Sequence, residues 1–226
     1  MVASGLLIIT IMSRVARFSF VLFTIITLAG AARGGEVTAG AVVREMNLAR
    51  QSPATYAGFL EDLRAHYNGR FLVLPGQTRI YMQEGLGAVD EAIHFLRSVQ
   101  PLQPLSFSPG LSRGAADHCA EQVGGATGHG NPASRMSRYG SWSASWGENI
   151  AYGKSSARDV VIALIIDDGL PARKHRANIF AAKFNYAGAA YGPHARYGSV
   201  CSIDFAGAYF ERGGPTANGS LVAKNF

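Results

Sequence analysis

Three short motifs carry the side chains of this chain that are best placed to do chemistry. They lie at residues 128–130 around His129, 147–153 around Glu148 and 174–180 around His175. Such side chains, in loops or at the ends of elements, can converge on a cleft without filling a core. Two neutral imidazoles and a carboxylate suit Zn²⁺ and similar borderline ions, with a fourth position left for water. The motifs therefore predict a site, in which the three groups either hold a ligand or brace the cleft by hydrogen bonds.

A serine motif offers a second chemistry. Residues 110–114 read Gly-Leu-Ser-Arg-Gly, which matches a nucleophile elbow around Ser112, and Asp167 and His175 follow in the chain order of a hydrolase triad. The elbow requires a buried strand before the serine, whereas Pro109 interrupts the short segment there. The chain also lacks an HGGG-type oxyanion motif. We interpret this match as a coincidence.

Helices are predicted wherever apolar residues recur every three or four positions. This spacing predicts helical segments over 42–63, with a break at Pro53, and over 88–99, ended by Pro101. A third helix is expected from Pro109 to about residue 123, since proline suits a first helical turn. Ser156 and Asp159 form a capping box ahead of an apolar run to residue 166, which predicts a central, covered helix.

Strands are expected in two hairpins. Residues 71–74 and 79–82 flank a Pro-Gly turn and predict a small arm, whereas the β-rich runs 186–191 and 199–208 predict a larger hairpin. Helices followed by antiparallel strands indicate an α+β layered domain.

The remaining histidines, tryptophans and cysteines receive structural interpretations. Two tryptophans before the Glu148 motif are expected to pack a cleft wall, with a carbohydrate platform as the alternative. Two cysteines exclude a CxxC metal site; they either form a disulfide or act as two buried small hydrophobic residues. Four further histidines are interpreted as solvated. The tryptophans are Trp142 and Trp146, the cysteines are Cys119 and Cys201, and the histidines are His66, His94, His118 and His194.

The first 31 residues are interpreted as a signal peptide. A basic segment at 13–17, an apolar run at 18–28 and small residues at 29–31 are typical of a cleaved export signal. This predicts a secreted or periplasmic protein without a stable membrane span, and Met12 is an alternative start to Met1. An uncleaved anchor is the other interpretation. The net charge of +6 comes without a run of Lys and Arg, which argues against nucleic acid as a partner.

The order of motifs resembles a bacterial member of the CAP superfamily, the SCP-domain proteins related to cysteine-rich secretory proteins, antigen 5 and pathogenesis-related 1 proteins. The resemblance covers residues 42–208 and leaves 209–226 as a C-terminal tail. It implies an α-β-α sandwich with a central antiparallel sheet. It is carried by Asn47-x-Ala49-Arg50, the helix start at 105–111, Gly128-His129, Gly147-Glu148-Asn149-Ile150, His175-Arg176-x-Asn178-Ile179 and Asp204-Phe205-Ala206.

Members of this family place two histidines and two acids around a central cleft, and several bind a divalent metal there. The resemblance assigns His129 and His175 to the histidines and Glu148 to one acid. The second acid lies before the second histidine, where the chain offers Asp167 and Asp168, and we choose Asp167. Zinc is the divalent ion that this donor set favours.

Three functions remain open at this stage. The first is an exported binding module whose cleft takes a metal and a lipid-like or peptide ligand. The second is a metal-dependent hydrolase, such as a peptidase, in which Glu148 acts as general base. The third is a surface interaction protein without ligand chemistry.

Overall fold

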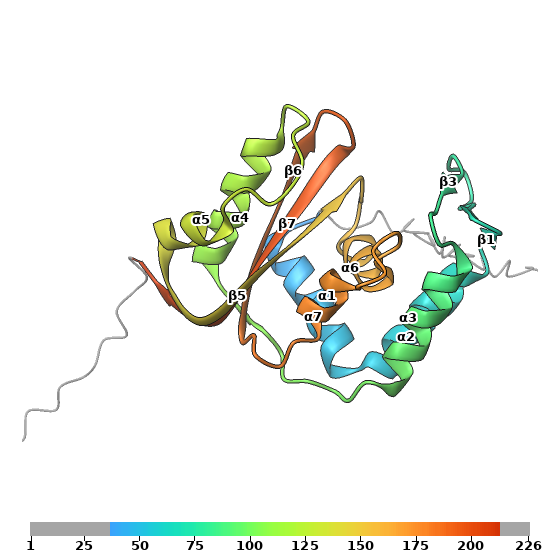
Figure 1. The fold of residues 1–226 in the computed structure, drawn as a ribbon, viewed down its shortest axis with the longest axis horizontal. Helices are drawn as coiled ribbons and strands as arrows, with labels where there is room; N and C mark the ends of the chain where they lie inside the picture. Colours follow the sequence, from blue (N-terminus) through green and yellow to red (C-terminus); the bar gives the residue numbers. More distant parts are fainter. Residues whose placement is uncertain (1–36, 213–226) are drawn as a thin grey trace, which may run out of the picture. The chain divides into compact units, whose positions relative to one another are not determined.

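A four-stranded mixed sheet forms the centre of the domain in the computed structural model, which describes residues 37–212. The strand order is β4 (Ser106–Phe107), β6 (Tyr186–His194), β7 (Gly198–Glu211) and β5 (Gly140–Tyr152) (Figure 1). The last three strands are antiparallel, and β6 and β7 form the predicted hairpin. The short β4 pairs with β6 in parallel. The expected α+β sandwich is therefore confirmed, but its sheet is mixed and not purely antiparallel.

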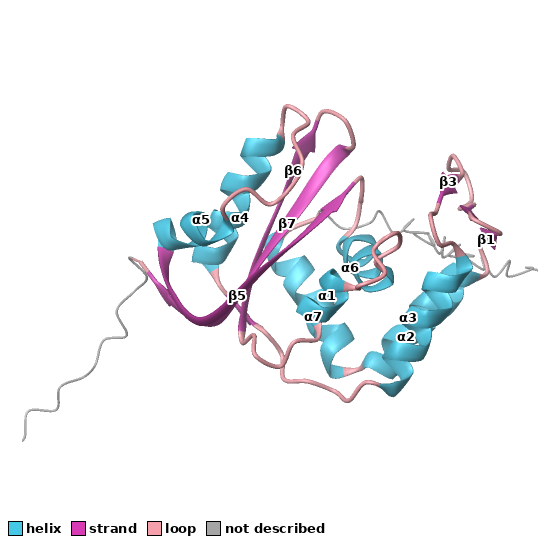
Figure 2. Ribbon diagram, viewed as in Figure 1, coloured by secondary structure: helices cyan, strands magenta, loops and turns pink. Residues whose placement is uncertain are grey.

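Helices cover both faces of this sheet (Figure 2). One face packs on α4 (Pro109–Gln122) and α5 (Pro132–Tyr139), and the other packs on α1 (Ala39–Gln51), α6 (Ala157–Ile166) and α7 (Lys174–Ile179). The helices α2 (Pro53–Arg64) and α3 (Leu86–Ser98) pair with each other and extend the second layer. Because both faces are covered, a polar residue on either face of the sheet is buried and requires a partner.

The helix boundaries follow the signals in the sequence. Ser52 and Pro53 separate α1 from α2, and α4 begins at Pro109. The Ser156 hydroxyl caps α6 by accepting the Asp159 amide at 3.0 Å. Ser112 lies in the first turns of α4 and donates its hydroxyl to the Ser108 carbonyl, so it is no nucleophile elbow.

The two cysteines lie on opposite faces of the sheet. Cys201, on β7, packs in the core shared with α1 and α6, whereas Cys119, on α4, packs with Val200 on the other face. Neighbouring residues of a strand point to opposite faces, so the sheet itself separates the two thiols. Both are buried and free. The disulfide interpretation is wrong, and that of two small hydrophobic residues is confirmed.

The predicted arm is present and contains one strand more than expected. Strands β2 (Phe71–Leu72) and β3 (Ile80–Tyr81) form the hairpin, and β1 (Tyr67–Asn68) pairs with β2. We call residues 66–82 the arm; Figure 1 shows it beyond the ends of α2 and α3.

Five elements were not expected from the sequence: α5, α7, the long strand β5 and the short strands β1 and β4. The Glu148 motif lies inside β5 and not in a loop, which corrects the first prediction for it. A bulge between Ser143 and Trp146, with Ala144 at φ 69°, interrupts the alternation that would have indicated a strand.

The last strand also continues past the expected domain end at residue 208. Tyr209 is buried and β7 ends at Glu211. The predicted signal peptide at 1–31, and the predicted tail from residue 213 onwards, lie outside the described residues. No helix within residues 37–212 is both long and apolar enough to cross a membrane.

Candidate functional site

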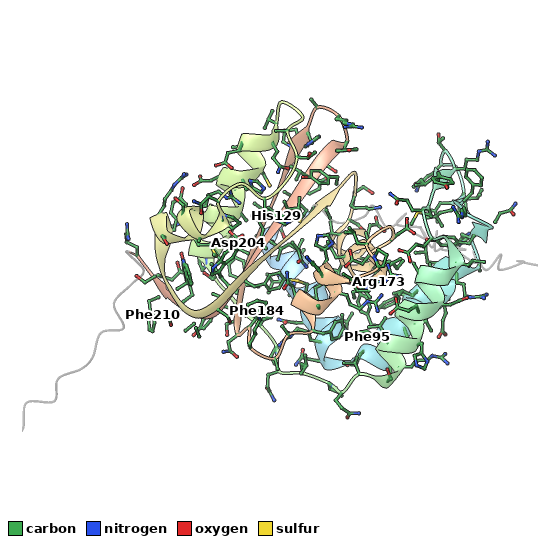
Figure 3. All side chains as sticks on the ribbon, viewed as in Figure 1. Phe95, His129, Arg173, Phe184, Asp204 and Phe210 are labelled. Atoms are coloured by element: carbon green, nitrogen blue, oxygen red, sulfur yellow. The ribbon has the colours of Figure 1, made fainter. Side chains whose placement is uncertain are left out.

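The first half of the site is an imidazole held against a buried carboxylate. Glu148 lies in β5 and is 6% exposed, whereas His129 lies in the loop between α4 and α5 (Figure 3). The His129 Nδ1 atom is 2.8 Å from Glu148 Oε1. Because a carboxylate only accepts hydrogen bonds, Nδ1 carries the proton. No residue among 37–212 contacts the other ring nitrogen, Nε2, by a hydrogen bond.

Arg135 neutralises the Glu148 carboxylate inside the protein. Its guanidinium donates from Nη2 to Glu148 Oε2 at 2.6 Å and to the His129 carbonyl at 2.9 Å, and from Nη1 to Glu121 at 3.2 Å. The side chains of Arg135 and Glu148 are 2% and 1% exposed. The Ser202 hydroxyl donates to the same Glu148 oxygen at 3.3 Å. Both oxygens of Glu148 are therefore engaged.

A second buried acid, Asp204, lies next to Glu148 on the neighbouring strand of the sheet. Asp204 lies directly opposite Glu148 in the β5 and β7 register and has no exposed surface. Burial, together with the neighbouring Glu148 charge, raises the pKa of Asp204 well above its ordinary value. A neutral Asp204 avoids two adjacent buried charges of the same sign. Arg135, which donates to Glu148, is the cation beside this buried pair of acids.

The loop that carries His129 is fixed at several points. The ring nitrogens Nε2 of His118 and His194 are 2.8 and 2.9 Å from the carbonyls of Gly128 and Ala126. The Gln122 amide also donates to the Gly128 carbonyl, at 2.7 Å. These contacts correct the prediction that all four other histidines are solvated. His118 and His194 are each 2% exposed, whereas His66 and His94 are exposed as expected.

The second half of the site repeats the first arrangement with different elements. Asp167 ends α6 in the left-handed conformation, at φ 56°, and turns its carboxylate towards the start of α7. One oxygen is 2.6 Å from His175 Nδ1 and the other accepts the His175 amide at 2.9 Å. The adjacent Asp168 instead accepts the amides of Gln83 and Glu84. The geometry thus pairs Asp167, and not Asp168, with His175.

An arginine network anchors the loop between α6 and α7. Arg173 donates to both oxygens of Glu84 at 2.7 Å and to Glu91 at 2.9 Å. Arg176 donates to both oxygens of Glu91 at 2.6 Å. These bidentate pairs tie residues 167–176 to α3 and its preceding loop, and so fix His175.

The side chains of His129 and His175 line the same two cavities. His129, Glu148 and His175 line one cavity of about 500 Å³, and both histidines line an adjoining cavity of about 330 Å³ together with Asp167. The three motifs singled out in the sequence are therefore brought together. The Nε2 atom of His175, like that of His129, has no hydrogen-bond partner among the described residues.

The described geometry offers two imidazoles to an ion, and not four direct ligands. Within residues 37–212 there is no cluster of three or more His, Cys, Asp or Glu side chains that could hold an ion. Glu148 and Asp167 instead bind the Nδ1 atoms, an arrangement that fixes the tautomer and leaves Nε2 as the donor in many metal sites. This makes both acids orienting partners in the described geometry, which differs from the predicted set of four ligands.

The His129 and Glu148 pair predicts a pH-dependent contribution to stability. The hydrogen bond to Glu148 raises the pKa of His129 above its ordinary value, and partial burial opposes this shift. A raised pKa in the folded state stabilises the fold below the ordinary pKa, and this contribution is lost as the pH rises through the raised pKa.

We therefore expect the free energy of unfolding of metal-free His129→Ala to differ most from that of the wild type below the ordinary histidine pKa, with a difference that narrows as the pH rises above it. Urea unfolding of the wild type and of His129→Ala at a series of pH values measures this difference in unfolding free energy. His94→Ala, which removes an exposed histidine, is the control. A difference that widens with pH would contradict the assigned pairing.

The tryptophans lie away from this site. Trp142 and Trp146 pack edge to face, with ring centroids 6.1 Å apart, and Trp146 is 40% exposed. Neither residue lines the two cavities that contain His129 and His175. The cleft-wall interpretation is wrong for these cavities. Trp142 instead packs against the cluster of Leu111, Met136, Ala206 and Tyr209.

Comparison with known proteins identifies the family. Residues 91–205 match the model of the cysteine-rich secretory protein family, CAP, and this segment contains both histidine and acid pairs. No curated protein matches the chain. A solved structure of a cysteine-rich secretory protein from Staphylococcus aureus is similar at 13% identity and a TM-score of 0.38. The alignment covers 58% of this chain and 42% of that one, so the chain spans less than half the length of that relative. Since the family model matches half of its length, the chain belongs to the CAP family.

Proposed function

We propose that this CAP domain is an exported binding module whose histidine cavity holds a divalent metal, zinc in the first place, together with a lipid-like or peptide ligand. One observation carries the metal proposal: two imidazoles, each anchored at Nδ1 by a carboxylate, line the same cavity with Nε2 free. When bound, the ion would supply a Lewis-acid position for an oxygen atom of the ligand. The signal-like residues 13–31 support export.

Zinc titration calorimetry tests this proposal. His129→Ala and His175→Ala each remove one donor, so we expect each to lower zinc affinity by about 100-fold or more. Asp167→Asn retains the His175 donor and removes the charge that orients it, so we expect a decrease in zinc affinity of about 10- to 100-fold. His94→Ala is the matched control, since this histidine is exposed on α3, and should bind zinc as the wild type does. Unchanged affinity in both cavity variants would refute the metal site.

The hydrolase alternative is less well supported by the geometry. A general base needs a free oxygen within reach of a substrate or water. Both Glu148 oxygens are engaged by His129, Arg135 and Ser202, and the side chain is 1% exposed. The third interpretation, a surface interaction protein without ligand chemistry, predicts an occluded cleft. The open cavities argue against it.

Glu148→Gln separates binding from catalysis. We expect the wild type to show no turnover of peptide or ester substrates with zinc present, because no separate nucleophile or oxyanion device accompanies the histidines. Assays of a mixed peptide library and of short-chain nitrophenyl esters measure this. Zinc-dependent cleavage that Glu148→Gln abolishes, measured at a zinc concentration that saturates the variant, would promote the hydrolase alternative.

A further inference from the structure

Lys154 lies where two cavities of different character meet. It follows β5 and lines both the smaller of the two cavities that contain the histidines and a separate cavity of about 360 Å³ between the arm, α2 and α6. We call the separate cavity the arm cavity. Hydrogen-bonding side chains in the histidine cavity include Thr127, His129, Tyr152 and His175. The wall of the arm cavity is mostly aliphatic and includes Leu63, Leu72, Ile80, Ile162 and Ile166.

The side chain of Lys154 has no partner for its charge. Among residues 37–212 it forms neither an ion pair nor a hydrogen bond through its ammonium group. Its main chain is held in place, because the hydroxyls of Tyr191 and Ser199 donate to the Lys154 carbonyl at 2.8 and 2.9 Å. Burial lowers the pKa of Lys154, and the charge of Asp159 opposes this shift. A cation that loses water without gaining a partner is suited to an anionic ligand.

The carboxylates that line the same two cavities are engaged elsewhere or solvated. Asp168 accepts two main-chain amides, at 2.7 and 2.8 Å. Asp167 binds the Nδ1 atom of His175. Asp159 is exposed to water. Each of these acids thus has its own partners or solvent, and the ammonium group of Lys154 remains available to a ligand.

A second polar group in the arm cavity also lacks a partner. The Tyr67 hydroxyl is buried, and no described residue forms a hydrogen bond with it. Buried hydroxyl groups are normally hydrogen-bonded, since an unmade bond costs about 1–3 kcal/mol. The arm cavity therefore offers a ligand one cation and one hydroxyl at an otherwise mostly aliphatic wall.

The last residue of a peptide chain matches this junction. Its Cα atom carries a carboxylate, a side chain and an amide, so a single residue presents an anion, an apolar group and a polar group to three different surroundings. A carboxylate beside Lys154 forms a charge-assisted hydrogen bond away from bulk water, where such a bond is strong. A simple fatty acid lacks the third substituent and would leave the polar histidine cavity without a complementary group.

We infer that the junction at Lys154 binds the C-terminus of a peptide that ends in a large apolar residue. The terminal carboxylate lies on Lys154, the last side chain lies in the arm cavity, and the preceding amides lie along the histidine cavity. This inference rests on the proposed function, because it names the peptide ligand of the same cavity. The contact with Lys154 itself does not require the metal.

Calorimetry of the metal-free protein with the peptide acetyl-Ala-Ala-Ala-Leu tests the role of Lys154. We expect the free acid to bind at least about 10-fold more tightly than the C-terminal amide of the same peptide, since only the acid brings a charge to Lys154. Lys154→Met should remove this preference and leave binding of the amide unchanged. Lys183→Met removes an exposed lysine that lines none of the three cavities and should retain the preference.

The peptide acetyl-Ala-Ala-Ala-Gly tests the arm cavity. We expect it to bind at least about 10-fold more weakly than the leucine peptide, because it has no side chain to bury. Ile80 lines the rim of the arm cavity and is 41% exposed, so Ile80→Asn should fold, weaken the leucine peptide and leave the glycine peptide unchanged. Val73→Asn is the matched control, since Val73 is 45% exposed on the same arm and does not line the cavity.

Several outcomes would overturn the inference. These are equal binding of acid and amide by the wild type, a preference that persists in Lys154→Met, and equal binding of the leucine and glycine peptides. Binding of dodecanoate without binding of either peptide would overturn it too. His129→Ala should lose zinc affinity and keep the preference for the free acid. Zinc binding without peptide binding would therefore refute this inference alone, and peptide binding without zinc binding would refute only the metal site.

Discussion

Replacing Arg135 by methionine is expected to lower the free energy of unfolding by about 3–5 kcal/mol. The guanidinium is the cation that balances the buried Glu148 and Asp204 pair, and it also binds the His129 carbonyl. Methionine fills a similar volume without a charge. The substitution therefore leaves a buried carboxylate without a counterion, which costs far more than the lost contact alone.

Arg138 provides a matched control on the same helix. Its ion pair with Asp117, at 2.8 Å, is between side chains that are 53% and 26% exposed. Water screens such a pair, so Arg138→Met is expected to cost less than about 1 kcal/mol. Urea unfolding of both variants at neutral pH measures the difference. Similar losses in the two variants would show that the buried carboxyl pair does not depend on Arg135.

The side chains that face the cavity were predictable from the sequence. His129, Glu148 and His175 lie in short motifs whose order is typical of the family, and glycines flank two of the three. The position of Asp167 directly after an apolar helix favours it over Asp168, and the structure gives the physical reason. A residue that ends α6 in the left-handed conformation can turn back towards the start of α7.

The groups that hold these side chains were not predictable in the same way. Arg135 lies on α5, a helix of eight residues whose asparagine cap and proline are its start signal in the sequence. His118 looks like an ordinary surface residue until the 124–131 loop folds over it. Such partners come from distant elements, so only the assembled fold brings them to the carboxylate.

The sequence around Asp204 carries a signal of its burial. In β7, Cys201, Ile203 and Phe205 face one core, whereas Ser202 and Asp204 lie on the alternate face. In a sheet covered on both sides, two polar residues at alternate positions are both buried. A buried acid on a strand adjacent to the Glu148 motif thus indicates a partner for it. The sandwich implied by the family resemblance was sufficient for this inference.

Close packing of α4 on the sheet is what keeps the acid pair buried. Gly188 on β6 is the register neighbour of Asp204, and a Cβ atom at this position would overlap the Ser112 amide nitrogen of α4. Gly114 on α4 approaches Asp204 in the same way, at 3.1 Å from a built Cβ to a carboxyl oxygen. Because backbone atoms cannot move aside as side chains do, glycine is required where helix and strand meet.

Gly188→Ala is therefore expected to destabilise the domain by about 3 kcal/mol, at the upper end of the range for overpacking. The added methyl group must displace α4 from the sheet and expose the Glu148 and Asp204 pair to water. Gly58→Ala is the matched control: it adds the same methyl group within α2, where nothing lies within 4 Å of the new atom. There, alanine favours the helix, and a gain of about 0.5–1 kcal/mol is expected. Urea unfolding of the two variants should thus give changes of opposite sign. A neutral Gly188→Ala would mean that α4 can shift without cost, in which case close helix packing is not what protects the buried acids.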